Sequence, residues 1–179
     1  MAWTSPPTAV ANSVLTSAMW NAGVRDNLLE TGPAIATSAG NLLVTGGVNQ
    51  IVERTVGFHE VLAAQQTSST TFTNLATVGP QVTVETGTRA LYIVSAQGSH
   101  SNDNHALRCS IEVSGATSIS PGDSREWLVD GLQAGQALAV SWAHMETNLT
   151  PGVNTFTVQY RVTAGTGTWS ERRLIVIPF

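Results

Sequence analysis

The side chains best suited to binding a divalent metal ion are concentrated in the segment His100-Ser-Asn-Asp103-Asn-His105. Imidazole and carboxylate groups are common metal ligands, and two histidines five positions apart on a loop could converge on one ion. The alternative is a polar loop between strands expected over 90–98 and 105–115, because asparagine and aspartate favour turns. The spacing lacks the specificity of a Cys/His framework. We therefore expect a polar loop and no bound metal.

Three carboxylates, Asp123, Glu126 and Asp130, could supply the acid and base of a glycoside hydrolase. Asp123, however, lies in a Pro-Gly-Asp-Ser turn, where its side chain would cap backbone N–H groups. Glu126 and Asp130 share one face of a strand and Trp127 and Val129 the other, which is the pattern of a solvated strand face. We expect structural roles for all three.

The other reactive residues do not form a catalytic motif. Cys109 falls on the apolar face of its strand, where it would act as a small buried hydrophobe. The sequence contains no G-x-S-x-G and no nucleotide-binding glycine loop. We predict that the protein is not an enzyme and needs no cofactor. Arg172 and Arg173, beside Glu171, could form cross-strand ion pairs.

Three tryptophans, Trp127, Trp142 and Trp169, are spaced fairly evenly along the C-terminal part of the chain. Exposed tryptophans can stack on sugars, whereas buried ones contribute area to a core or a subunit interface. A carbohydrate-binding module that contacts host-surface glycans is the alternative function. Its candidate ligand surface would consist of His100, Asp103, His105, Trp142 and Trp169.

The composition shows what kind of structure must position these residues. Only 11% of the 179 residues are charged, there is no lysine, and the net charge is −4. Nucleic-acid affinity needs clustered basic residues, and here the arginines are scattered, so we expect no nucleic-acid partner. No apolar run approaches the ~20 residues of a membrane span, so we expect no membrane insertion. The abundance of threonine and valine favours β structure.

The N-terminal part, residues 1–57, predicts an arm. Residues 1–12 should be extended, and a helix over about 16–30 should begin at Thr16 or Ser17 and end at Gly32-Pro33. An apolar stripe runs along this helix through Trp20, Val24 and Leu28, and Met19 widens it. One helix cannot bury its own stripe, which must pack on the β domain, on symmetry mates or on another protein. Residues 31–57 predict a linker with a small hairpin.

From residue 58 onward the hydrophobic period is two, as in Val82/Val84, Leu91/Ile93 and Phe156/Val158/Tyr160/Val162. Turn signals such as Pro121-Gly122 and Pro151-Gly152 separate the runs. The last run, residues 172–179, ends in almost continuous apolar residues, which is typical of a central strand or of one buried on both sides. The sequence predicts a mainly β fold in which residues 58–179 form an antiparallel β-sandwich or jelly roll of roughly 120 residues.

Several segments together resemble a known group of proteins. The N-terminal segments Met1-Ala-Trp3-Thr-Ser-Pro6 and Leu15-Thr16 to Val24-Arg25-Asp26-Asn27-Leu28 resemble the start of small virion proteins of tailed phages, which follow W-T-x-P and V-R-D-N-L. The segment 39–46 is similar to the G-D-L-L-x-A-T-G linkers of phage fibre proteins, and 149–179 resembles the closing strands of the same proteins. Two departures are Ala9, where many relatives have tryptophan, and Asn41, which replaces an aspartate.

The resemblance implies a non-enzymatic phage structural protein that forms a homotrimer and is located in the virion, after assembly in the bacterial cytoplasm. It leaves open a minor tail or tail-fibre protein and a capsid decoration or head-fibre protein. The partners would be other copies of this chain and other capsid or tail proteins. On this interpretation the residues that carry docking and oligomerisation are Trp3, Met19, Trp20, Val24, Arg25, Asp26 and Leu28.

Overall fold

The computed structural model describes residues 11–14, 16–29 and 31–179. The chain divides into two compact units, which we call the arm and the head. The arm is Met1–Thr55 together with Phe179, and the head is Val56–Pro178. The division falls two residues before the expected boundary at 57/58. Each unit is described by itself below.

The arm contains a helical stretch over residues 17–29 that changes its winding. It consists of α1 (Ser17–Trp20), a π-helical turn (Asn21–Arg25) and α2 (Asp26–Leu29). The Thr16 hydroxyl accepts a hydrogen bond from the Met19 amide at 3.2 Å, so the predicted N-cap is confirmed. The expectation of one helix was incomplete, because a second short helix, α3 (Gly32–Ile35), follows. Proline suits the first turn of a helix as well as the position after one.

The expected hairpin of the arm is confirmed. It is formed by β1 (Leu42–Gly47) and β2 (Gln50–Arg54), which pair antiparallel. Asn49 occupies the turn with a φ of 54°, a left-handed conformation that asparagine tolerates better than most residues.

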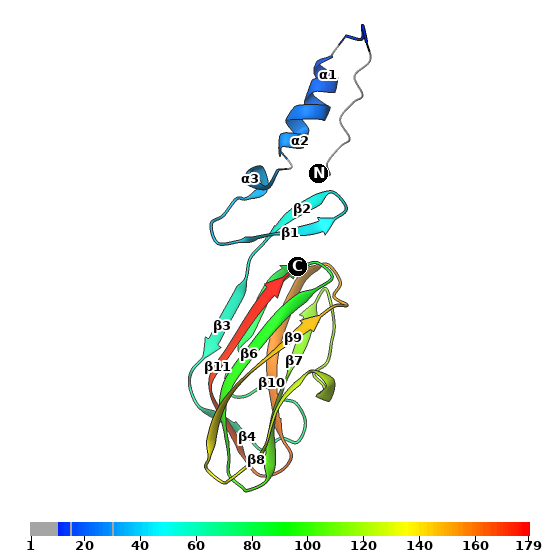
Figure 1. The fold of residues 1–179 in the computed structure, drawn as a ribbon. Coiled ribbons are helices and arrows are strands. Elements are labelled where there is room, and N and C mark those ends of the chain that lie inside the picture. Colours follow the sequence, from blue (N-terminus) through cyan, green and yellow to red (C-terminus); the bar gives the residue numbers. More distant parts are fainter. Residues whose placement is uncertain (1–10, 15, 30) are drawn as a thin grey trace. The chain divides into compact units, whose positions relative to one another are not determined.

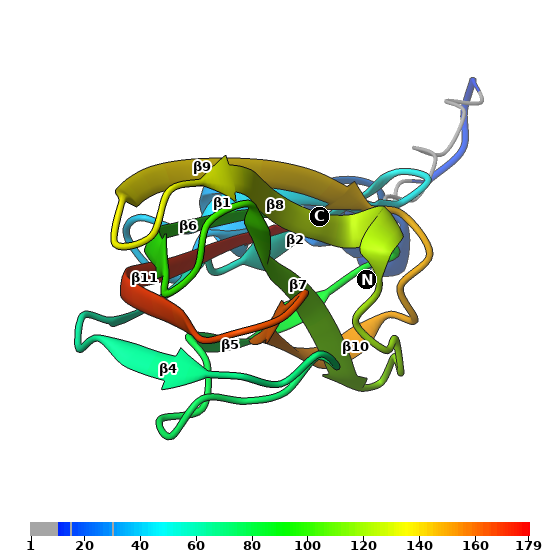
Figure 2. The same cartoon turned by 90° about the horizontal axis from the view of Figure 1, so that it is seen from below.

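The head is a sandwich of two antiparallel sheets (Figure 1). The β11 sheet has the order β3-β11-β6-β9, and β4 also pairs with β11; in the view from below, β4 lies beside β11 (Figure 2). Its strands are β3 (Gly57–Val61), β4 (Gln65–Thr67), β6 (Ala90–His100), β9 (Ala137–Glu146) and β11 (Gly167–Pro178).

The second sheet, the β10 sheet, has the order β5-β10-β7-β8. Its strands are β5 (Gln81–Thr86), β7 (His105–Gly115), β8 (Glu126–Leu132) and β10 (Gly152–Val162), with a short 3₁₀ turn, η2 (Asp123–Arg125), before β8. Strands that follow one another along the chain mostly alternate between the two sheets, which is the connectivity of a double-sheet jelly roll. The predicted fold class is confirmed.

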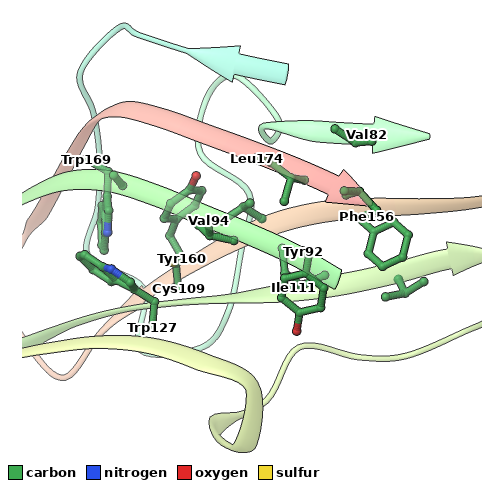
Figure 3. Close-up of a cluster of buried hydrophobic side chains, with 14 of the residues drawn as sticks. Val82, Tyr92, Val94, Cys109, Ile111, Trp127, Phe156, Tyr160, Trp169 and Leu174 are labelled. Carbon is green, nitrogen blue, oxygen red and sulfur yellow. The ribbon is translucent and has the colours of Figure 1, made fainter. Parts of the chain in front are cut away.

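The core lies between the two sheets (Figure 3). Phe156, Val158, Tyr160 and Val162 of β10 are all completely buried, as their alternation predicts. Cys109 of β7 is 1% exposed and belongs to the same cluster. The period-two pattern of these strands therefore identified their buried face.

Strand β6 shows where the same pattern misleads. Its core side chains are Tyr92 and Val94, which are 0% and 3% exposed, whereas Leu91 and Ile93 have the opposite parity and are half-buried on the outer face. The alternation of Leu91 and Ile93 located the strand without showing which face enters the core. Because β6 is apolar on both faces, periodicity alone does not separate them.

No helix within the described ranges is long and apolar enough to cross a membrane.

Candidate functional site

The candidate metal ligand His100 is a buried structural residue. It ends β6 and is 2% exposed. Its Nδ1 accepts a hydrogen bond from the Asn102 amide at 2.9 Å, so in the neutral ring the proton is on Nε2, which donates to the Ala164 carbonyl at 2.7 Å. Both ring nitrogens are therefore engaged by backbone groups of two loops.

The other two candidate ligands of this segment, Asp103 and His105, also have contacts within the protein. The Asp103 carboxylate accepts a hydrogen bond from the Ala134 amide at 2.6 Å. The His105 ring lies 5.4 Å from the His100 ring, at 38° between the planes. Among the residues that the structure describes, no three His, Cys, Asp or Glu side chains gather as a metal site would require. These contacts support the interpretation of a polar loop.

The tryptophans do not form an exposed platform for sugars. Trp127 and Trp169 are 2% and 0% exposed, and their side chains lie near each other in the core (Figure 3). Trp142 of β9 is half-buried, meets Tyr92 edge to face at 5.6 Å between centroids, and stacks on His144 at 5.3 Å. The assignment of Trp169 and His100 to a ligand surface was wrong, because side chains of this burial have no face for a ligand.

The candidate catalytic carboxylates are held in ion pairs and turns. Glu126 pairs with Arg108 and, at 3.5 Å, with Arg161, and its side chain is 9% exposed. Arg161 also binds the Asp123 carboxylate at 2.7 Å. The Asp130 carboxylate accepts from the Gly131 amide at 2.8 Å. Glu126 is thus less solvated than expected, and all three carboxylates have structural partners.

A polar hollow of about 500 Å³ lies at the loops that follow β6 and β10. Its walls are polar, with Ser99, Ser101, Thr166 and Thr168 among the lining residues. It contains no aromatic ring apart from His100, whose nitrogens are already bonded, and no carboxylate or arginine. The hollow therefore lacks the groups that orient a sugar or activate a nucleophile.

The predicted docking residues give the arm an exposed apolar stripe. Trp20, Val24 and Leu28 are 53%, 36% and 60% exposed, and Met19 is half-buried. Arg25 and Asp26, which are also among the predicted docking residues, pair with each other at 2.7 Å. Trp3, the remaining docking residue, lies outside the described residues. The arm thus has large apolar side chains in water at the predicted positions.

A carboxylate in the arm that sequence reasoning missed organises the segment before the hairpin. Glu53 of β2 accepts hydrogen bonds from the Thr37 hydroxyl and amide, the Ser38 amide at 3.0 Å and the Asn41 side chain at 3.1 Å. These bonds, chiefly that from the Thr37 hydroxyl, lower the pKa of Glu53 to about 2. The departure at Asn41 is explained, because an aspartate there could not donate to Glu53 and would repel it.

Arg172 and Arg173 are neighbours in β11 but differ in environment, because Arg172 is buried and Arg173 is partly exposed. Arg173 pairs with Glu60 across the strands at 3.2 Å and with Glu171 at 2.7 Å, as expected. Arg172 is completely buried. A bulge in β11 between Ser170 and Arg173 turns it inward, and nothing in the sequence pattern marked this irregularity.

No protein-family profile matches this chain, and no curated protein matches it. Among solved structures, the infectious bursal disease virus Gx strain aligns at 15% identity and a TM-score of 0.46, over 74% of this chain. The VP2 subviral particle of the same virus aligns at 14% identity and 0.44, over 80%. The chain spans only 35% and 41% of these two viral chains.

A carbohydrate-binding module of Cellvibrio mixtus lichenase 5A, in complex with cellotriose, aligns at 14% identity and a TM-score of 0.31, over 81% of this chain and 92% of the module. None of the three alignments reaches a TM-score of 0.5, so no function is inferred from them.

Proposed function

We propose that this chain is a non-enzymatic structural protein of a tailed-phage virion, anchored to the particle by its arm and projecting its head as a surface component. The observation that carries the proposal is the exposed apolar stripe of the arm helix, which coincides with the V-R-D-N-L element shared with phage virion proteins. The proposed oligomer is a homotrimer of this chain. In the bacterial cytoplasm the trimer would assemble with other capsid or tail proteins into the virion.

The stripe is the kind of surface that permanent assembly buries. Trp20 and Leu28 are each more than half exposed. Large apolar groups that gather on one side of a helix mark an interaction surface, and permanent complexes bury such surfaces. The Arg25–Asp26 pair lies within the helix and adds no net charge to it.

The contacts inside the head favour a structural role. The side chains that were candidates for catalysis or metal binding are bonded to other groups of the protein: His100 to backbone groups, Glu126 to two arginines, and Asp103 and Asp130 to loop amides. A general acid, base or nucleophile must be free to reach a substrate. The same contacts make a stable scaffold for display.

The carbohydrate-binding alternative loses its main support, because Trp169 is buried and Trp142 is partly covered by His144. A glycan array with the full chain tests it directly. Binding that disappears in Trp142→Ala would favour the alternative, and it would equally suit a fibre that contacts the host surface.

The test of the proposal is incorporation of a stripe variant, Trp20→Ser/Val24→Ser, into phage particles. We expect the variant to be absent from purified virions while its head unfolds at the wild-type temperature. The matched control is Val48→Ser, which removes an exposed apolar side chain from the hairpin turn of the arm and should leave incorporation unchanged. A variant retained at the wild-type copy number would contradict the role of the stripe.

Location in the particle is a separate question that copy number decides. A tail-tip or fibre protein is present in few copies, whereas a capsid decoration or head-fibre protein is present in many. Quantitative mass spectrometry of wild-type virions distinguishes the two. Virions that lack the protein altogether would overturn the proposed function.

A further inference from the structure

We propose that copies of this protein associate head to head through the outer face of the β11 sheet. This inference rests on the self-association in the proposed function and names the surface responsible. The surface is an apolar band that crosses the outer face of the sheet. Its residues are Phe58, Leu91, Ile93, Met145, Ile175 and Ile177.

The register of the strands makes the band continuous. Ile175 of β11 is directly opposite Ile93 of β6 on one side and Phe58 of β3 on the other. One pair further along, Leu91 of β6 is opposite both Ile177 of β11 and Met145 of β9. Side chains opposite each other on one face of a sheet are about 5 Å apart, so β3, β11, β6 and β9 contribute to one surface.

The band lies on the side of the sheet that faces away from the core. Leu174 and Val176 of β11 are completely buried against the other sheet, and Ile175 and Ile177 have the opposite parity. At the margins of the band Phe58 is 58% exposed and Met145 is 42% exposed. Strands that are apolar on both faces are typical of sheets covered on both faces, and within the head, Val56–Pro178, no second layer covers this outer face.

The outer face of the β10 sheet provides the contrast. Its centre carries the Arg108–Glu126 and Arg161–Glu126 pairs and the hydrogen bond between Gln159 and Glu112 at 2.9 Å. Thr83 and Thr155 bond to each other across β5 and β10 at 2.9 Å. This face has the polar surface expected of a sheet in water, so the apolar outer face of the β11 sheet is specific to that sheet.

Strand β9 extends the surface to an open edge. In the part of the chain that the structure describes, β9 pairs only with β6. Residues 131–145 contain no Asp, Glu, Lys or Arg, and Met145 is exposed on the outer face. Charged residues, prolines and bulges are the devices that protect edge strands. Within its paired length β9 has no proline and no bulge, and its one Asp, Glu, Lys or Arg residue is Glu146 at the very end of the strand. An unprotected edge next to an apolar band indicates a surface that is covered in the assembled protein.

The charges around the band identify a second copy of the chain as the occupant. Arg173, beside the band, is already paired with Glu60 and Glu171. The band itself is uncharged, so two copies meet without opposing like charges, and a strongly charged partner would find no complementary group. In the proposed homotrimer the bands of the three copies would meet around the threefold axis, which gives a closed symmetric assembly.

The test compares two double variants of the full chain by sedimentation equilibrium. The band variant is Phe58→Glu/Met145→Glu. The control is Val153→Glu/Leu128→Glu, which places the same two charges on β10 and β8, on the outer face of the other sheet, at side chains that are 58% and 46% exposed. All four substituted side chains are at least 42% exposed, and near-wild-type thermal unfolding of both variants shows that the head still folds.

We expect the band variant to weaken association by at least about tenfold and the control to change it by less than about threefold. Equal weakening by both variants, or no weakening by the band variant, would overturn the inference. A wild-type chain that stays monomeric at about 100 µM would also overturn it.

These outcomes are distinct from the test of the proposed function. Incorporation into virions is measured on particles and depends on the arm stripe. A protein that is incorporated into virions and does not associate through the band would leave the proposed function standing.

Discussion

The guanidinium of Arg172 lies over the ring of Tyr160, 5.5 Å from its centroid, and both side chains donate to the Gly79 carbonyl at 3.1 Å. Arg172 also donates to the Gln65 side-chain oxygen at 2.8 Å. The two terminal nitrogens of this completely buried cation are thus bonded to neutral acceptors, and its guanidinium lies against an aromatic face, whereas its Nε has no hydrogen-bond partner among the residues that the structure describes. Arg172 joins β11 to the loops on either side of β4.

This arrangement predicts how substitutions at Arg172 will differ. Arg172→Ala should lower the free energy of unfolding by about 3 kcal/mol, because it leaves a cavity in the core. Arg172→Met should lower it by about 1 kcal/mol or less, because the Gly79 carbonyl keeps the Tyr160 hydroxyl and Gln65 keeps the Thr77 amide as donors. Urea denaturation measures both.

The neighbouring Arg173 is the control for this series. Its ion pairs are exposed, so Arg173→Ala should cost less than about 1 kcal/mol. An Arg172→Met variant as unstable as Arg172→Ala would show that the charge, and not the volume, stabilises the site.

The buried thiol predicts that stability falls in alkaline solution. Burial, with a smaller contribution from Glu126, raises the pKa of the Cys109 thiol well above its usual range. Above pH ~8.5 the unfolded chain loses this proton and the folded chain keeps it, so stability is full below that pH and falls as the pH rises. Between pH 8 and pH 9.5 the loss should be about 1 kcal/mol.

Cys109→Ala isolates this effect. The variant is less stable at pH 8 because of its cavity, and the gap between it and the wild type should narrow by pH 9.5. Buried Tyr92 and Tyr160 also have raised pKa values and act in the same direction at higher pH, in both proteins. A constant gap between the two urea midpoints would contradict the prediction.

Glu53 predicts an acid-sensitive segment in the arm. Its pKa is lowered to about 2, so the hydrogen bonds from Thr37, Ser38 and Asn41 are fully formed above the ordinary glutamate pKa and are lost as the pH falls toward 2. Glu53→Gln should speed amide hydrogen exchange at Thr37 and Ser38 at neutral pH. Glu60→Gln, a head residue, is the control and should leave these two amides unchanged.

A related substitution tests the role of Asn41. Asn41→Asp restores the residue found in the resembling linkers and removes a donor to Glu53. We expect the pKa of Glu53, followed by NMR titration of its side-chain carbonyl, to rise relative to the wild type. An unchanged titration would show that Asn41 contributes nothing to the cluster.

The His100 contacts predict that the head does not respond to metal ions. Zn²⁺ or EDTA should leave the melting temperature unchanged within experimental error, because both nitrogens of His100 are bonded to backbone groups. His100→Ala should lower the melting temperature through these lost bonds. A stabilisation by Zn²⁺ that His105→Ala abolishes would refute the interpretation of this loop.

The local sequence pattern was sufficient to predict the helix cap and the buried face of β10. It was insufficient to predict contacts between residues far apart in the sequence. The alternation in β10 predicted four completely buried residues, and Thr16 was recognised as a helix cap, because both depend on neighbours within a few positions. The inward turn of Arg172 depends on a bulge, and the Glu53 cluster on groups twelve to sixteen residues away. No periodicity encodes either.

The candidate ligand surface failed for the same reason. Tryptophan is common both in cores and at binding surfaces, and only the partner across the sandwich decides between the two. Trp169 meets Tyr160 of the opposite sheet at 5.2 Å between centroids. The sequence pattern identified the apolar residues of β6 but did not show which of them face the core. The residues on the outer face, Leu91 and Ile93, belong to the apolar band proposed above as the association surface.

The central place of β11 has a consequence for the order of folding during synthesis. It lies between β3 and β6, yet it follows every other strand of the head along the chain (Figure 1). Until residues 167–178 leave the ribosome, β3 has no strand partner and β6 can pair only with β9. Such pairings across long sequence separations are slow to form. The edges of β3 and β6 therefore stay unpaired in the nascent head until β11 is synthesised. The β11 sheet is then completed when β11 pairs with both strands.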